Sequence, residues 1–459
     1  MKRPWSPAVW FGWLAAVGAC GFSPDGGRAP DAVDAAVDAP CVPGCNPAGD
    51  EAITCDGGHE TATPCAYGCI DDPGAPVCAR TLVPSNVDPA TLTKFSLADV
   101  QGGIPFTAGT RFAIDTDSGT IWEFPPIGQA MTIRTGEGLS NNIGFQQVSA
   151  TMSVLGVLEL RVVAGSTLEI YGTRGLVILA KLDAIIDGRV RADGGLCDSV
   201  AKRLGCNGAG GGWGAGELTD DATGCAPGGN GQDGTFSTGG GGGGMATAGA
   251  NGGTSDISFG GVAASDLSAC AGETLVPLAG GGGGGSSPGA VGGGGGGALQ
   301  ITAYGTMRVS ATGVVTAVGS GGEGTTSFDD GGGGGGAGGA ILLEGESLDV
   351  GAGTISVAGG GGGGGRFPGN DGQSGRTDGQ PALGGLGDGP GMVDGLGGNG
   401  AIDSVAALPG RSNATGNLDG TGGGGGGLGR IRVNSVRGDT ARGSKFVGRY
   451  TAGRTTRGR

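Results

Sequence analysis

The chain has 459 residues and a formal net charge of −15, and 115 of its residues are glycine and 22 are proline. Such a composition without a collagen-like period is typical of low-complexity or disordered chains, so order has to be established segment by segment. With only five lysines there is no broad basic face to neutralise phosphates, and we expect no nucleic-acid partner.

Residues 1–19 have the layout of an export signal. Lys2 and Arg3 give a positive start, and the apolar run AVWFGWLAAVGA follows at 8–19. The run is too short for a membrane span and ends in small residues, as a signal cleavage site requires. We therefore expect the mature protein to be exported.

Cys20 follows this signal directly, in the sequence Val17-Gly18-Ala19-Cys20. These residues resemble the lipobox of bacterial lipoproteins, with valine in place of the usual leucine. The resemblance implies cleavage before Cys20 and acylation of that residue, which would anchor the protein to a membrane through several acyl chains. Secretion without a lipid is the alternative. Residues 20–40 are rich in Asp, Ala and Pro, lack the apolar surface that folding needs, and are predicted to form an extended spacer.

The other ten cysteines fall into two even groups, which predicts disulfide bonds in an exported protein. Six lie in a short module at 41–79 and four in the glycine-rich region: Cys41, Cys45, Cys55, Cys65, Cys69 and Cys78, then Cys197, Cys206, Cys225 and Cys270. The small module cannot bury a sufficient core and needs covalent cross-links. Metal binding is the alternative for the C-x3-C spacings, but His59 is the only histidine, and we expect neither a metal nor a cofactor.

Residues 80–150 are predicted to be β-rich, with short apolar segments between turn residues. In RFAIDTDSGTIWEF, apolar residues lie on both sides of a turn, which predicts a hairpin. The spacing of Asp115 and Asp117 in this turn resembles the start of a calcium-binding loop. Pro126 stands where such a loop needs a glutamate, so we interpret the aspartates as turn residues.

Residues 151–436 contain an internal repeat. Three copies begin with a glycine that is followed by alternating apolar residues: GRVRADG at 188–194, GVVTAVG at 313–319 and GTISVAG at 353–359. Further apolar segments precede each copy, and partial copies occur at 153–173 and from Gly427. Because a short strand cannot cover its own row of apolar side chains, we expect the copies to stack on one another.

A unit of about twenty residues with three strands predicts an all-β fold of the parallel β-helix or β-solenoid type, in which each copy forms one coil. An antiparallel meander or sandwich is the alternative, because Tyr304-Gly305 and Thr312-Gly313 also fit hairpin turns. The sequence leaves both arrangements open.

Glycine-rich tracts at about 195–297, 319–339 and 359–427 interrupt the copies. Flexible loops are one interpretation. Ordered segments are the other, since four cysteines lie inside the longest tract, and ordered glycine needs dense backbone hydrogen bonding or cross-links. The tracts resemble the glycine-rich domain of anaplastic-lymphoma-kinase-type receptors, and this resemblance implies left-handed polyglycine-II helices packed side by side.

The repeat region holds one charged cluster, formed by Lys181, Asp183, Asp187, Arg189, Arg191 and Asp193. Paired acids can carry out general acid–base catalysis, so a carbohydrate-active β-helix enzyme, a polysaccharide lyase or hydrolase, is the alternative function. Solvated outward positions of a strand are the simpler interpretation, and we assign no catalytic residue. The basic tail at 437–459 is expected to be a solvated, frayed terminus or a contact for acidic groups.

The order of signal, cysteine, spacer, six-cysteine module and glycine-interrupted repeats resembles predicted surface lipoproteins of myxobacteria and similar predatory soil bacteria. The resemblance implies a place in the cell envelope, as an outer-membrane lipoprotein or on the extracellular surface, more than a chemistry. We therefore expect a non-enzymatic structural or adhesive scaffold that displays glycine-rich loops. Its expected partners are the membrane, through the lipid, and extracellular polysaccharide or other surface proteins.

Overall fold

The computed structural model describes residues 41–47, 51–56, 59–65, 69–70, 75–78, 81–195, 207–214, 220–234, 237–255, 258–327, 329–387, 394–412, 420–436 and 445–458. The chain divides into two units, Met1–Cys41 and Val42–Arg459, and the described residues lie almost wholly in the second. In the described ranges there is no α-helix, and two 3₁₀ turns, η1 (Pro89–Thr91) and η2 (Leu97–Asp99), are the helical elements. The predicted all-β class is confirmed.

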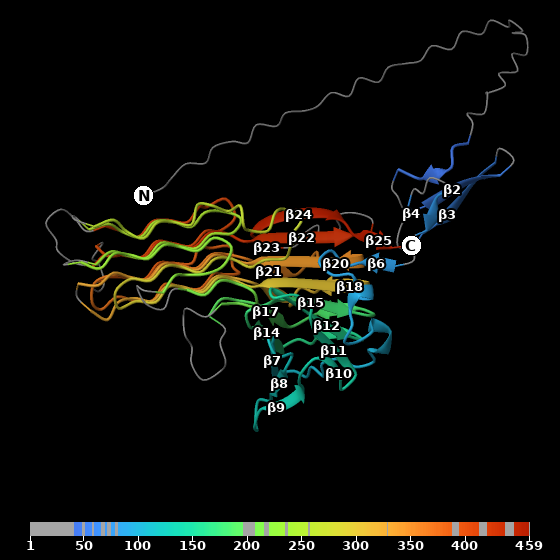
Figure 1. Cartoon of the computed structure of the whole chain (residues 1–459), viewed down its shortest axis with the longest axis horizontal. Coiled ribbons are helices and arrows are strands. Elements are labelled where there is room, and N and C mark those ends of the chain that lie inside the picture. The colour runs from blue at the N-terminus through green and yellow to red at the C-terminus, as the bar shows by residue number, and fades with distance from the viewer. Residues whose placement is uncertain are drawn as a thin grey trace, which may run out of the picture. The chain divides into compact units, whose positions relative to one another are not determined.

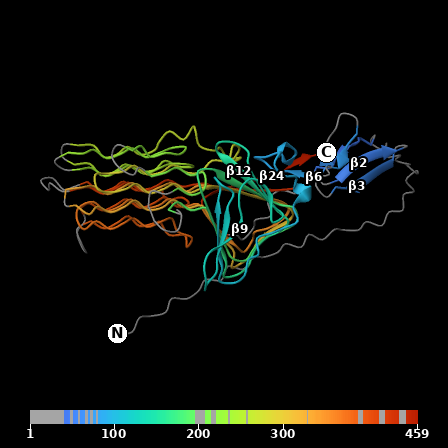
Figure 2. The ribbon, with the colours of Figure 1, turned by 60° about the horizontal axis from the view of Figure 1, so that its bottom comes forward.

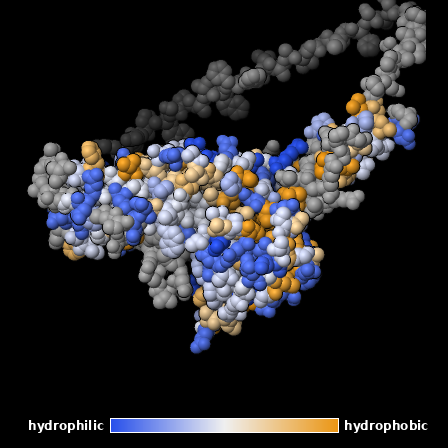
Figure 3. Space-filling model, in the orientation of Figure 1, coloured by the Kyte–Doolittle hydropathy of each residue, from blue (hydrophilic) through white to orange (hydrophobic). Residues whose placement is uncertain are grey.

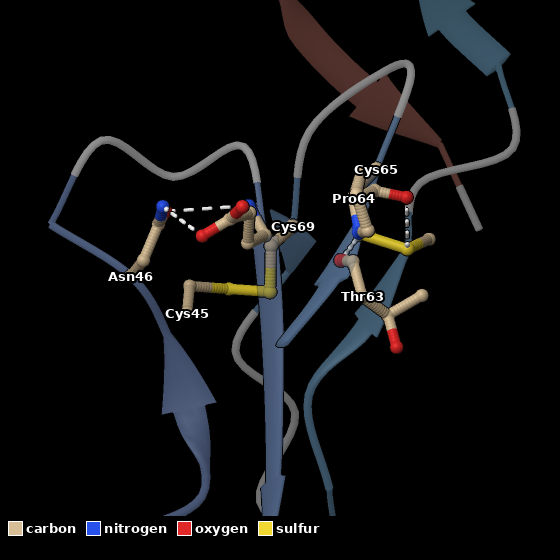
Figure 4. Close-up of a disulfide and its surroundings, with 8 residues drawn as sticks. Cys45, Asn46, Thr63, Pro64, Cys65 and Cys69 are labelled. Atoms are coloured by element: carbon tan, nitrogen blue, oxygen red, sulfur yellow. Dashed lines mark hydrogen bonds between the residues drawn. A yellow bond between two sulfur atoms is a disulfide. The ribbon is translucent and has the colours of Figure 1, made fainter. Parts of the chain in front are cut away.

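The cysteine-rich module is built from short antiparallel strands: β1 (Gly44–Cys45), β2 (Glu51–Asp56), β3 (His59–Pro64), β4 (Cys69–Ile70) and β5 (Val77–Cys78). Disulfide bonds join Cys45 to Cys69 and Cys65 to Cys78, and Figure 4 shows the first of them with Asn46 next to it. The buried cluster of the module consists of these cysteines and one alanine. Cross-links therefore replace a core here.

Six strands come next: β6 (Thr81–Val83), β7 (Arg111–Asp115), β8 (Ile121–Phe124), β9 (Met131–Arg134), β10 (Gly138–Ser140) and β11 (Ile143–Gln147). β7 and β8 form the predicted antiparallel hairpin. Asp115 closes its turn, because its carboxylate accepts hydrogen bonds from the Asp117 N–H at 2.8 Å and the Ser118 hydroxyl at 2.7 Å. The interpretation of Asp115 as a turn residue is confirmed.

The repeats supply the remaining strands: β12 (Met152–Val157), β13 (Leu160–Val162), β14 (Thr167–Tyr171), β15 (Gly175–Ala180), β16 (Ala184–Ile186), β17 (Arg189–Arg191), β18 (Ala298–Val309), β19 (Val314–Thr316), β20 (Ala340–Asp349), β21 (Thr354–Ser356), β22 (Arg430–Ser435), β23 (Lys445–Val447), β24 (Arg449–Arg454) and β25 (Thr456–Gly458).

Strands from the same place in successive repeats pair in parallel. β12, β15, β18, β20, β22 and β24 lie side by side in a ten-stranded sheet (Figure 1). β14, β17, β19, β21 and β23 do the same in an eight-stranded sheet. The predicted parallel pairing is confirmed, and the antiparallel alternative does not describe these repeats.

The register of the strands matches the repeat seen in the sequence. In the eight-stranded sheet, Val190 lies opposite Val315, and Val315 lies opposite Ile355. In the ten-stranded sheet a second column runs through Leu155, Ile178, Ile301, Leu343 and Val433. Both columns belong to one buried cluster, in which each large side chain contributes about 1.5–3 kcal/mol. Stacking thus covers the apolar rows that single copies leave open.

The glycine that begins each copy lies where the chain passes very close to the preceding copy. A Cβ atom at Gly188 would lie 2.3 Å from the Val163 carbonyl oxygen, and one at Gly313 would lie 2.2 Å from the Ile186 carbonyl oxygen. No side chain fits at such distances, which is why these positions require glycine.

The C-terminal segment corrects the expectation of a frayed basic tail. Residues 445–458 form β23, β24 and β25, which pair with β21, β22 and β6. Phe446 and Tyr450 stack with ring centroids 4.2 Å apart and pack against the main buried cluster. The prediction of a frayed tail rested on the number of arginines in this segment. The burial of these two aromatic side chains stabilises the segment against the sheets. Residues 437–444 lie outside the described ranges.

The other face of the ten-stranded sheet is covered by a segment at 85–100. Phe95 and Val100 pack there in a second buried cluster. Glu344 on β20 is fully buried and accepts hydrogen bonds from the Ser85 N–H at 3.1 Å and the Gln300 side chain at 2.7 Å. Because buried polar groups need such partners, these bonds fix the segment to the sheet.

The described parts of the glycine tracts are ordered, in extended segments that run beside one another (Figure 2). Successive N–H groups of residues 239–244 donate to different neighbouring segments, and the same neighbour returns every third residue. The bonds run from Gly239 to Gly253, Gly240 to Gly332, Gly241 to Gly229, Gly242 to Ala250, Gly243 to Gly335 and Gly244 to Ala226. Residues 332–338 and 422–427 follow the same period. Flexible loops do not describe these segments.

Neighbouring segments of this glycine array approach too closely for side chains. A Cβ atom at Gly240 would lie 2.1 Å from the Gly285 carbonyl oxygen, and one at Gly334 would lie 2.1 Å from that of Gly241. A disulfide between Cys225 and Cys270 cross-links the longest tract. On the visible face these segments are mostly white and blue, with scattered apolar residues in orange (Figure 3).

Candidate functional site

A groove of about 420 Å³ lies beside β17 and β19 of the eight-stranded sheet. One side carries Arg189, Arg191 and Asp193, with Thr316 from β19 beside them. The opposite wall is the segment 374–378, which belongs to the third glycine-rich insertion. The site therefore combines residues of a sheet with residues of the glycine array.

Strand alternation places the arginines in the groove. Successive side chains of a strand point to opposite faces, so the burial of Val190 directs Arg189 and Arg191 outward. Arg191 lies in register with Thr316, which therefore shares its face.

Carboxylates hold Arg191 in position. Its Nε lies 2.8 Å from the Asp193 carboxylate, and its guanidinium lies 3.5 Å from Glu169, which also pairs with Arg111 at 2.7 Å. Asp193 is almost fully buried and also accepts a hydrogen bond from the Val318 N–H at 3.0 Å. The charge of Asp193 raises the pKa of Arg191, which therefore remains a cation throughout the physiological pH range.

The opposite wall is fixed to the sheet by two hydrogen bonds. The Ser356 hydroxyl donates to the Arg376 carbonyl at 2.7 Å, and the Gly375 N–H donates to the Gly319 carbonyl at 2.9 Å. Arg376 forms an ion pair with Asp378. Hydrogen bonding to Arg376 holds the pKa of the Asp378 carboxyl well below its usual range, so this group is ionised at neutral pH.

Two polar groups that line the groove, and one lysine near its wall, have no partner within the described part of the chain. Arg189 is exposed and forms no ion pair there. Lys445 occupies a neighbouring position, since a Cβ atom at Gly379, next to the wall, would lie 3.9 Å from its Cε. Thr316 is only 4% exposed, and its hydroxyl is buried without a hydrogen-bond partner.

The structure brings together only half of the predicted charged cluster. Lys181 lies elsewhere and donates to the Ala98 carbonyl at 2.8 Å. Asp183 accepts from the Thr306 N–H at 2.7 Å, and Asp187 lies 3.6 Å from Arg308. None of Lys181, Asp183 and Asp187 lines the groove.

No sequence pattern indicated Arg376, Asp378 or Thr316 as site residues. Arg376 and Asp378 lie about 185 residues after β17, in the third glycine-rich tract. No spacing in the sequence links them to that strand. Thr316 occupies an outward position of the second repeat copy, and its burial depends on the wall across the groove. The repeat alignment marked its position but not its environment.

The remaining predicted site residues are cysteines. Cys41 and Cys55 are disulfide-bonded in addition to the pairs described above. Cys20, Cys197 and Cys206 lie outside the described residues. Within the described residues there is no cluster of His, Cys, Asp and Glu that could hold a metal ion, and no helix is long and apolar enough to cross a membrane.

Comparisons with known proteins add no relative. No protein-family model, no curated protein and no solved structure matches this chain.

Proposed function

We propose that the protein is an exported, non-enzymatic scaffold of the cell surface, anchored by a lipid on Cys20. Its body would be a β-solenoid, each repeat forming one coil, and its glycine insertions would form a lateral bundle of polyglycine-II-like helices. The observation that carries this proposal is the three-residue period of hydrogen bonds in the array. Three residues per turn is the period of the extended left-handed helix, whose backbone groups point outward to neighbours.

The array supports a structural role because its contacts are made by backbone. Buried glycine tracts from all three insertions hydrogen-bond to one another, as the links from Gly240 to Gly332 and from Gly424 to Gly240 show. Such a bundle offers a rigid, closely packed body with few side chains for chemistry. A structural or adhesive element of the envelope fits this composition.

The charges of the groove favour binding over catalysis. A general acid needs a carboxyl with a raised pKa, whereas the pKa of Asp378 is lowered by Arg376. Asp193 is bonded to Arg191 and to a backbone N–H. Both acids therefore act as partners that position arginines, and the lyase or hydrolase alternative gains no support from them.

Disulfide bonds support export. Disulfides persist in oxidising compartments such as the periplasm and the cell surface, and three are placed within the described residues. The lipid anchor itself rests on the lipobox-like sequence that ends at Cys20.

Mass spectrometry of the mature protein under non-reducing conditions tests the proposal. After expression in a bacterium that processes lipoproteins, we expect an N-terminal peptide that begins at Cys20 with an acyl mass increment. We also expect no free thiol at the other ten cysteines. The Cys20→Ser variant should leave the membrane fraction, while a mature chain without lipid in the unchanged protein would contradict the anchor.

Assays of polysaccharide cleavage separate scaffold from enzyme. We expect no new chain ends when the protein is incubated with uronate polymers, with or without calcium. Turnover that Asp193→Asn abolishes would overturn the non-enzymatic assignment.

A further inference from the structure

We propose that the groove between β17, β19 and the wall at 374–378 binds an acidic polysaccharide through its carboxylate groups. The inference deepens the proposed scaffold role by naming the class of molecule to which the protein adheres. It depends on the unpaired groups at the groove, on the positioned arginines beside them, and on the strip of sheet that leads away from it.

Within the described residues, one cation that lines the groove, Arg189, is free to pair with a ligand, and a second free cation, Lys445, lies three strands away in the same sheet. Arg189 is exposed, and Lys445 lies on the same face, since both residues occupy the register position of Val314 in their own strands. Arg189 presents a planar fork that matches a carboxylate in two parallel hydrogen bonds.

The other arginines are already positioned by carboxylates, and this placement leaves them further donors. Arg191 is bonded to Asp193 through Nε, so other guanidinium N–H groups remain for a ligand. Arg376 faces it from the opposite wall. A ligand anion would then be held from two sides without any reorganisation of long side chains.

The buried hydroxyl of Thr316 is the second independent observation. A buried hydroxyl without a partner costs free energy in the unliganded protein. Thr316 is one of the residues that line the groove, so a polar ligand that displaces the atoms covering this hydroxyl would supply the missing hydrogen bond. Ser374 and Thr377 add hydroxyl groups on the wall. This set of cations and hydroxyls matches a molecule that carries both carboxylates and hydroxyls.

The face of the sheet continues from the groove as a strip suited to an extended chain. In register with Arg191 come Glu169 on β14, Ala113 on β7 and Trp122 on β8. The Trp122 ring stacks on that of Tyr171 with centroids 6.1 Å apart. Neighbouring strands lie about 4.8 Å apart, so the strip extends for roughly 20 Å from β8 to β19. Partly exposed aromatic rings at its far end offer apolar faces against which sugar rings can pack.

Binding of polygalacturonate to the full exported protein, measured by titration calorimetry, tests the inference. We expect saturable binding that weakens as salt is raised, because the contacts are between charges. A neutral dextran of similar length should not bind. A sulfated polysaccharide tests whether the carboxylate is required, and weaker binding is expected because its tetrahedral groups do not match the planar fork.

Two variants and a matched control locate the site. Arg189→Ala should weaken polygalacturonate binding about tenfold or more, as expected for loss of a charge-assisted hydrogen bond. Thr316→Val should weaken binding about three- to tenfold while leaving thermal stability unchanged or raising it, because the replaced hydroxyl is buried without a partner in the protein. Arg161→Ala is the control, since Arg161 is an exposed arginine on β13, away from the groove.

Three results would overturn the inference: no binding to polygalacturonate, equal binding by the Arg189→Ala and unchanged proteins, or equally tight binding of poly-glutamate. The last result would indicate a response to charge alone. None of them would affect the scaffold proposal, which is tested by lipidation and by the stability of the glycine array.

Discussion

Glycine is required in this protein for two different reasons at the scale of single residues. At the start of each repeat copy it lets the chain pass close to the preceding copy, as at Gly188. Inside the array it lets neighbouring extended segments approach until a Cβ atom would overlap a carbonyl oxygen, as at Gly334. In both cases the limit is set by backbone contact across the sequence and not by a turn conformation.

Alanine at Gly334 should therefore destabilise the protein. The added methyl would lie 2.1 Å from the Gly241 carbonyl oxygen, so the segments must move apart, at a cost of about 1–3 kcal/mol or more. Urea unfolding of the full chain measures the change. Gly272→Ala is the matched control, because no atom lies within 4 Å of a Cβ there, and it should be neutral or slightly stabilising. Equal effects of the two variants would show that the array is not closely packed in solution.

At the scale of elements, the short strands are stable only through their neighbours. β17, β19 and β21 each contain three residues and place a single large apolar side chain in the core. The columns formed by stacking, and not the strands themselves, are the units of stability. Such a strand would be marginal alone.

Ile355→Ala should remove one member of such a column. Ile355 is fully buried opposite Val315, and truncation should cost about 2–5 kcal/mol, with the transfer and cavity effects combined. Thermal or chemical unfolding measures the loss. Thr354→Ala, the outward neighbour on the same strand, should cost less than about 1 kcal/mol. A similar loss for both would contradict the assignment of the inward face.

At the scale of the whole molecule, two kinds of order coexist. The sheets bury aliphatic columns, whereas the glycine array is held by backbone hydrogen bonds with little apolar side chain between its segments. Regions with few buried apolar contacts open at lower free energy than the core. The array is therefore expected to depend more on its cross-link than the sheets do.

Replacement of Cys225 and Cys270 by serine tests this dependence. The disulfide spans 45 residues, and its loss should cost about 4 kcal/mol in the chain-entropy model. Hydrogen exchange should show a fall in amide protection of at least tenfold within 223–285, while amides of β15 and β18 change little. Equal loss of protection in those strands would mean that array and sheets unfold as one unit.

Much of the fold could be predicted from the sequence because the sequence contains an internal repeat. The alignment of Gly188, Gly313 and Gly353 placed Val190, Val315 and Ile355 in one column, and the strands adopt that register. Side-chain alternation fixes which residues are inward in each copy, whatever the loops between copies contain. The prediction of a frayed C-terminal tail was wrong because it rested on the charge of the segment. Phe446 and Tyr450 instead pack against the main buried cluster.

Only half of the groove could be predicted from the sequence. Arg189, Arg191 and Asp193 belong to a visible cluster, but their partners across the groove come from a distant insertion. The other three members of the cluster are close to these residues in sequence but bond elsewhere. Lys181 donates to the Ala98 carbonyl, Asp183 accepts from the Thr306 N–H, and Asp187 pairs with Arg308.

By itself the sequence determined the all-β class and the repeating apolar rows, because these depend on local pattern. The tertiary structure alone decided that the glycine tracts form an array and that a charged groove lies at its edge. Both features arise from backbone hydrogen bonds between segments tens to hundreds of residues apart. Because glycine has no side chain, the sequence of a glycine tract does not indicate which other segment it will contact.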